Sequence, residues 1–118
     1  MTPDSPTILV VDDDPRYCNL LGLYLESEGF HVLKADSGRV GLQVLEEREP
    51  DVTLLDLKLN DIDGWTFYRQ SRAGGYTRPI VIVSGQGAAK ARRELGAEAS
   101  LEKPFELEQA AEVVRAVL

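Results

Sequence analysis

Short apolar segments alternate with amphipathic segments along most of the chain. Apolar and β-branched residues dominate residues 7–11, 51–55 and 79–83. Apolar runs of this length are typical of strands that are covered on both faces, as in a parallel sheet. Two further strands are predicted at residues 30–35 and 97–102, the second of which has the weakest pattern.

Between these strands, apolar residues recur at the three- and four-residue spacing of helices that bury one face. The first helix is predicted to start at Pro15, with Asp14 as its N-cap, and to stop before Gly29. The other helices are predicted around residues 40–45, before Pro50, and over residues 64–73, 86–95 and 107–118. The helix over residues 86–95 is short and rich in Gly and Ala.

Five alternations of strand and helix predict one α/β domain with a doubly wound, five-stranded parallel sheet. Right-handed crossovers then place helices on both faces of the sheet. The domain is expected over residues 7–118, and residues 1–6 are expected to form a disordered tail. No linker or low-complexity segment divides the chain.

Charge and composition narrow the class of protein. The 118 residues include 20 acidic and 13 basic residues, for a net charge of −7. This balance argues against direct binding to nucleic acid or to anionic membranes, which favours an excess of Lys and Arg. Cys18 is the single cysteine, so an internal disulfide is excluded. With neither a leader pattern nor a long apolar run, the domain is expected to be soluble and cytoplasmic.

Polar residues follow the predicted strands where the strands end. Asp12, Asp13 and Asp14 follow the first strand, Asp56 the third, Ser84 the fourth and Lys103 the fifth. Ligands of open α/β sheets bind beyond the carboxyl ends of the strands. Clustered carboxylates favour Mg²⁺ or Mn²⁺, and a nearby Lys and Ser can donate to phosphoryl oxygens. The sequence therefore predicts an acidic metal pocket that can hold a phosphoryl group, and it lacks a nucleotide-binding motif.

Four segments in this order carry a family resemblance: ILVVDDDP, DVTLLDLKLNDIDG, PIVIVSG and LEKPF. Together they resemble the receiver domain of two-component response regulators, over roughly residues 7–118. The resemblance implies a flavodoxin-like fold, similar to the chemotaxis regulators, with strand order 2-1-3-4-5. It also implies a cis Lys103–Pro104 bond.

The resemblance assigns a role to each pocket residue. Asp56 would accept a phosphoryl group from a histidine kinase or a histidine phosphotransfer protein, and Ser84 and Lys103 would bind that group. Asp12, Asp13, Asp56 and the Lys58 backbone carbonyl would hold the metal, whereas Asp14 would serve only as the helix cap. The side chains of Lys58 and Gln86 would tune the lifetime of the acyl phosphate. Such a domain catalyses only its own phosphorylation and dephosphorylation.

Three features of the sequence depart from the family pattern. Asn60 stands where many relatives have Pro, and the segment from Ser84 to Lys103 is short. In the switch that the resemblance implies, a hydroxyl residue moves toward the phosphoryl group and an aromatic ring turns into the space it leaves. Ser84 and Ser100 occupy these two switch positions, but Ser100 has no aromatic ring. We therefore expect the helix that carries Lys90, Arg92 and Arg93 to reorganise as a unit instead.

Alternative functions remain open. The chain could be a receiver-fold protein-binding module that does not use phosphorylation, or a Mg²⁺-dependent phosphatase. Asp61 and Asp63 could suggest a second metal site, but Asp63 is better interpreted as a helix cap. His31 is interpreted as structural and Cys18 as a packing residue.

The sequence also leaves open how such a domain would pass on its signal. No output domain is expected within these 118 residues, and the sequence does not name the downstream protein. It leaves open a monomer or a phosphorylation-dependent dimer, and a free-standing regulator or part of a longer one.

Overall fold

The structure is a computed structural model and describes residues 5–118. Its strands are β1 (Thr7–Val11), β2 (His31–Ala35), β3 (Val52–Asp56), β4 (Ile80–Ser84) and β5 (Ala99–Glu102). Its helices are α1 (Pro15–Ser27), α2 (Gly38–Arg48), α3 (Gly64–Ala73), α4 (Ala88–Leu95) and α5 (Leu107–Val117). The strands form one parallel sheet in the order β2-β1-β3-β4-β5, which confirms the predicted fold class.

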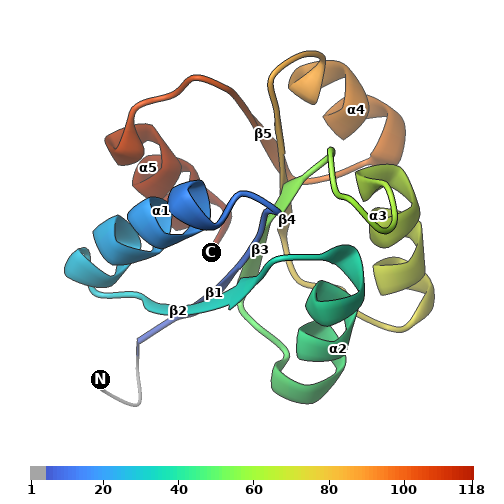
Figure 1. The fold of residues 1–118 in the computed structure, drawn as a ribbon, viewed down its shortest axis with the longest axis horizontal. Coiled ribbons are helices and arrows are strands. Elements are labelled where there is room, and N and C mark those ends of the chain that lie inside the picture. Colours follow the sequence, from blue (N-terminus) through green and yellow to red (C-terminus); the bar gives the residue numbers. More distant parts are fainter. Residues whose placement is uncertain (1–4) are drawn as a thin grey trace.

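Helices cover both faces of the sheet (Figure 1). The helices α1 and α5 lie on one side, and α2, α3 and α4 lie on the other. Successive residues of a strand point to opposite faces. In β1, Ile8 and Val10 therefore belong to the core under α1 and α5, whereas Leu9 and Val11 belong to the other core. Coverage on both faces explains why β1, β3 and β4 are apolar without alternation.

Two helices start at the aspartates that the sequence indicates. The Asp14 carboxylate accepts a hydrogen bond from the Arg16 N–H at 3.0 Å, and Pro15 is the first helical residue of α1. The Asp63 carboxylate accepts from the Thr66 N–H at 2.7 Å at the start of α3. Both predicted caps are confirmed, and both aspartates satisfy backbone donors that have no partner within the helix.

The boundaries around α4 differ from the prediction. The helix begins at Ala88, two residues later than expected, because Gly87 has a φ of +72° and cannot belong to a right-handed helix. At the other end, Gly96 has a φ of +81°, and the Ala97 N–H bonds back to the Arg92 carbonyl at 3.0 Å. The helix therefore ends at Leu95, residue 97 lies in the turn before β5, and β5 is only four residues long.

The predicted tail at residues 1–6 lies largely outside the described residues. Within them, the Pro6 carbonyl accepts a hydrogen bond from the His31 N–H at 2.9 Å. Within residues 5–118, none of the helices combines the length and the apolar character that crossing a membrane requires.

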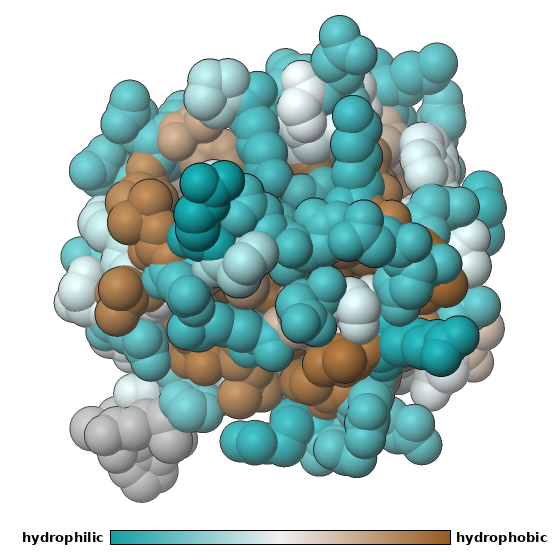
Figure 2. Space-filling view, in the orientation of Figure 1, coloured by the Kyte–Doolittle hydropathy of each residue, from teal (hydrophilic) through white to brown (hydrophobic). Residues whose placement is uncertain are grey.

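The face shown in Figure 2 is mostly hydrophilic, with apolar side chains at the left of the view, where α1 lies, and along its lower part. Among the described residues, the exposed large hydrophobic side chains are Leu20 and Leu23 of α1, Val40 of α2 and Leu118. Leu20 and Leu23 therefore form an apolar pair on one helix, which we call the α1 leucine pair.

Candidate functional site

The predicted site residues meet at one edge of the sheet. Asp12 directly follows β1, Asp56 is the last residue of β3, Ser84 is the last residue of β4, and Lys103 directly follows β5. Because all five strands are parallel, these positions share the carboxyl edge. The topology thus brings together residues that lie far apart in the sequence.

Lys103 joins two of the carboxylates. Its Nζ lies 2.7 Å from Asp56 Oδ2 and 3.1 Å from Asp12 Oδ2. Asp56 and Asp12 are only 7% and 3% exposed, respectively. Ionised carboxylates at such depth need a partner, because burial strips them of water. The ammonium of Lys103 is that partner, so the three side chains act as one charged unit.

Burial and pairing act in opposite directions on this unit. Burial raises the pKa of Asp12, although the Asp14 N–H and the Lys103 ammonium both favour its ionised form. For Lys103, burial lowers the pKa, but the hydrogen bonds to Asp56 and Asp12 outweigh burial and raise it. Lys103 is therefore a cation at neutral pH, whereas burial makes the ionised form of Asp12 less favourable than it is in water.

The second oxygen of Asp56 is occupied by the loop that follows. Asp56 Oδ1 accepts a hydrogen bond from the Lys58 N–H at 2.8 Å. This bond holds the Lys58 backbone beside the carboxylate, while the Lys58 side chain is exposed. Both oxygens of Asp56 are thus held in place by hydrogen bonds.

The donor set suits a hard divalent cation. Carboxylate and carbonyl oxygens are the ligands that Mg²⁺ prefers, and Mg²⁺ commonly uses one or two carboxylates with water and phosphate oxygens. Within residues 5–118, no three carboxylate, imidazole or thiolate side chains converge closely enough to enclose an ion. A cation bound by carboxylates at this edge would therefore take its other ligands from the backbone, water or a phosphoryl group.

Ser84 is turned toward its own loop. Its Oγ donates to the Gln86 carbonyl at 2.8 Å and accepts from the Gln86 N–H at 3.2 Å. The Ser84 carbonyl also accepts from the Lys103 N–H at 2.8 Å, which ties the end of β4 to the lysine. The Gln86 side chain is exposed. Ser84 is thus near Lys103 through its backbone, with its hydroxyl engaged elsewhere.

The remaining predicted features are also in place. The Lys103–Pro104 bond is cis. Ser100 is half-buried on β5, opposite Ile82 of β4. His31 starts β2, at the edge opposite the acidic residues. Cys18 is buried against the Val10 carbonyl, and burial raises the pKa of its thiol to about 11, which agrees with a packing role.

Sequence reasoning missed three residues around the site. Glu102 accepts a hydrogen bond from the Gly87 N–H at 3.2 Å and thereby supports the start of α4, which has no side-chain cap. The ring of Tyr17 faces the Lys103 ammonium. The Asp61 carboxylate accepts hydrogen bonds from the first turn of α2. The apolar spacing that marks Tyr17 also fits a core residue, the sequence suggests Asp61 only as a metal ligand, and no local pattern marks Glu102.

Asp61 anchors the loop that follows Asp56. Its two carboxylate oxygens accept hydrogen bonds from the N–H groups of Gly38 and Arg39, each at 2.8 Å, at the first turn of α2. These backbone donors lower the pKa of Asp61 to about 2. The loop that contains Lys58 is therefore attached at both ends, at Asp56 and at α2.

Replacing this anchor is expected to destabilise the fold in a pH-dependent way. Asp61→Asn removes the charge that the two N–H groups favour, so the free energy of unfolding should fall at neutral pH. The pKa of Asp61 is about 2 in the folded protein, whereas its ordinary value is 3.8. The stability advantage of the wild type is therefore complete above pH 3.8 and is lost as the pH falls through about 2. Urea unfolding of both proteins between pH 1.5 and 7 measures this difference. Equal pH profiles would contradict it.

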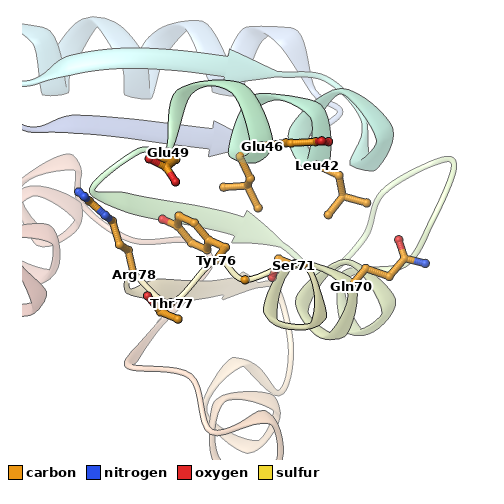
Figure 3. Close-up of a pocket in the computed structure, with 11 residues that line it drawn as sticks. Leu42, Glu46, Glu49, Gln70, Ser71, Tyr76, Thr77 and Arg78 are labelled. Carbon is orange, nitrogen blue, oxygen red and sulfur yellow. The ribbon is translucent and has the colours of Figure 1, made fainter.

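A separate groove lies away from the acidic residues (Figure 3). It has a volume of about 460 Å³ and lies between α2, α3 and the segment before β4. Glu46, Glu49 and Gln70 line it, and Tyr76 and Arg78 approach from the loop. These loop residues precede β4, so the groove opens near the amino edge of the sheet and contains none of the predicted site residues.

Comparison with known proteins agrees with this geometry. The family model for the response regulator receiver domain matches residues 8–115. Among curated proteins, the transcriptional regulatory protein GlrR of Escherichia coli is 35% identical over 84% of this chain. The DNA-binding dual master transcriptional regulator RpaA of Synechocystis is 33% identical over 96% of the chain. The matched segments span 23% and 49% of those two relatives, respectively.

Solved structures show the same fold over nearly the whole chain. A response regulator from Chloroflexus aurantiacus is 34% identical, with a TM-score of 0.89 over 97% of this chain and 98% of that chain. A CheY-like receiver domain protein from Methanospirillum hungatei is 25% identical, with a TM-score of 0.88 over 96% of this chain and 93% of that chain. The family match, the fold and the acidic edge therefore agree: the chain belongs to the response regulator receiver domains of two-component systems.

Proposed function

We propose that the domain accepts a phosphoryl group on Asp56 in a Mg²⁺-dependent reaction and signals by a change of conformation. The donor would be a phosphohistidine on a histidine kinase or a histidine phosphotransfer protein. The observation that carries this proposal is the buried Asp56 carboxylate at the sheet edge, paired at 2.7 Å with the Lys103 ammonium. Such a pair offers a nucleophile and, beside it, a cation for the phosphoryl oxygens.

In the proposed reaction, a carboxylate oxygen of Asp56 attacks the phosphorus atom. The new P–O bond forms as the P–N bond of the phosphohistidine breaks, and the imidazole leaves with the bonding electrons. Lys103 exchanges its bond to Asp56 for one to a phosphoryl oxygen, and Ser84 exchanges its bonds to Gln86 for another. Asp12, Asp13, Asp56 and the Lys58 carbonyl would hold Mg²⁺ or Mn²⁺, which supplies positive charge against the repulsion between carboxylates and phosphoryl oxygens.

The domain is proposed to act on itself rather than to turn over an external substrate. Loss of the phosphoryl group requires a water molecule to attack the acyl phosphate. The side chains of Lys58 and Gln86 are exposed near the ends of β3 and β4 and are proposed to tune that attack. Output would pass to a downstream protein through the loop between Ser84 and α4, which the movement of Ser84 releases.

Intact mass spectrometry tests this function. The protein is incubated with Mg²⁺ and a small phosphodonor such as acetyl phosphate, then with a phosphohistidine donor, each with and without EDTA. A gain of one phosphoryl group that requires Mg²⁺ supports the proposal. No gain with either donor would instead favour a binding module that does not use phosphorylation. Turnover of a small phosphomonoester would indicate a phosphatase.

Mg²⁺ is expected to stabilise the folded protein. The buried charge of Asp12 disfavours the folded state, and a bound cation offsets that cost. At about one hundred times the dissociation constant, a ligand specific for the folded state adds about 2.7 kcal/mol to the free energy of unfolding. Thermal unfolding with increasing Mg²⁺, with K⁺ at matched ionic strength as the control, measures the effect. A midpoint that responds equally to both salts would contradict a specific site.

The α1 leucine pair is proposed to contact the phosphodonor protein. The helix α1 begins three residues after Asp12, so its amino end flanks the acidic edge, and the leucine pair lies further along the same helix. Leu20 and Leu23 are 55% and 64% exposed, and apolar side chains of this kind commonly anchor protein contacts.

Replacing both leucines with Ser should affect a protein donor and a small-molecule donor differently. Phosphotransfer from a phosphohistidine protein should slow by about tenfold or more, because apolar contact area is lost, whereas phosphorylation by acetyl phosphate should be unchanged. Val40→Ser, which removes an exposed apolar side chain from α2, is the matched control. Equal slowing with both donors would indicate damage to the site rather than to docking.

A further inference from the structure

We infer that Tyr17 is a positioning residue for Lys103, whose ammonium it holds over the two carboxylates with the face of its ring. The inference deepens the proposed function and rests on it, because it concerns the lysine that would meet the phosphoryl group. It assigns to Tyr17 a role that its place in the apolar stripe of α1 does not indicate.

The ammonium of Lys103 has neighbours on three sides. Its Nζ lies 2.7 Å from Asp56 Oδ2, 3.1 Å from Asp12 Oδ2 and 4.4 Å from the centroid of the Tyr17 ring. A cation within about 6 Å of an aromatic face is attracted by the negative charge of that face. The ring therefore stabilises the ammonium without adding a formal charge to a pocket that is already acidic.

The ring is itself held in place. Tyr17 is half-buried on α1, and its ring meets that of Phe105 edge-on, with centroids 5.9 Å apart and planes at 86°. Tyr17, Asp12 and Asp56 line the same small hollow of about 10 Å³, which leaves room for at most one water molecule. Burial raises the pKa of the Tyr17 phenol to about 12, so the side chain is neutral at physiological pH.

The contact between the Tyr17 ring and Lys103 matters most after Asp56 has been phosphorylated. Once Asp56 becomes an acyl phosphate, Lys103 loses one of its anionic partners and must find a phosphoryl oxygen instead. A free Lys side chain has many rotamers, and ordering it has an entropic cost. The Tyr17 ring does not take part in the reaction, so it keeps the ammonium near the same place. The aromatic face, and not the hydroxyl group, is what the role requires.

Phosphorylation rates with acetyl phosphate and Mg²⁺ test the inference. Tyr17→Phe keeps the face and should keep the rate, whereas Tyr17→Leu should slow it by about fivefold, within the range of cation–π interactions. Phe105→Leu removes the edge contact but leaves the face, and its rate should stay within about twofold of the wild type. In a Lys103→Met background, the further change Tyr17→Leu should have no effect, because nothing is left to position.

A second readout does not depend on phosphorylation. The ring face should shift the proton resonances of the Lys103 ε-methylene upfield, and this shift should persist in Tyr17→Phe and disappear in Tyr17→Leu. An equal slowing by Tyr17→Leu with and without Lys103, or an unshifted methylene in the wild type, would overturn the inference. A wild type that shows the shift but takes up no phosphoryl group would instead refute the proposed function, and the functional role of Tyr17 would fall with it.

Discussion

Asp56→Asn is expected to abolish phosphorylation by both small and protein donors. The amide has nearly the same size and can still accept a hydrogen bond from the Lys58 N–H, but it is not a nucleophile toward phosphorus at neutral pH. Removing the charge at this position should leave Lys103 bonded to Asp12. The fold should therefore persist while the chemistry is lost, and intact mass after incubation with Mg²⁺ and donor should show no gain.

Asp36→Asn is the matched control. Asp36 follows β2 and is exposed, so it lies at the carboxyl edge of a strand without contacting the Lys103 cluster. This variant should gain one phosphoryl group at the rate of the wild type. Phosphorylation of Asp56→Asn to the level of this control would show that another residue is the acceptor. A peptide map of the phosphorylated protein would then identify that residue.

Lys103→Met is expected to slow phosphorylation by about 10²- to 10³-fold, the range seen when one preorganised electrostatic donor is removed from a reacting group. Met has a similar length but carries no charge, so the phosphoryl oxygens lose their cation and the buried carboxylates lose theirs. Because the raised pKa of Lys103 keeps it protonated, the wild-type rate should not fall between pH 7 and 9 through loss of this charge. Stopped-flow rates with acetyl phosphate measure both effects.

Two further variants separate charge from position. Lys90→Met removes an exposed lysine from α4 and should leave the rate unchanged. Lys103→Arg keeps the charge but presents a planar guanidinium, which does not reproduce the contacts of a compact ammonium, so its rate should lie between those of the wild type and Lys103→Met. If Lys103→Met reacts as fast as Lys90→Met, Lys103 has no role in transfer and serves only to neutralise Asp12 and Asp56.

Much of the fold and most of the site could be predicted from local sequence patterns. Apolar runs such as residues 79–83 predict buried strands, because only a strand covered on both faces lacks polar alternation. Asp14 and Asp63 predict helix starts, because a carboxylate before an amphipathic segment can satisfy the free N–H groups. Once the strands are known to be parallel, Asp12, Asp56 and Lys103 must meet, because their strands end at the same edge.

The contacts around the site depended on the tertiary structure. The Lys103 ammonium bonds to residues 47 and 91 positions away, and the Tyr17 ring meets it from α1. Asp61 caps a helix that precedes it in the chain, and Glu102 supports one from the next strand. Local patterns report which face of an element is buried, but not which distant side chain packs there. The sequence thus determines the elements and the edge where the chemistry lies, whereas packing between helices and loops determines how Lys103 and Asp56 are held.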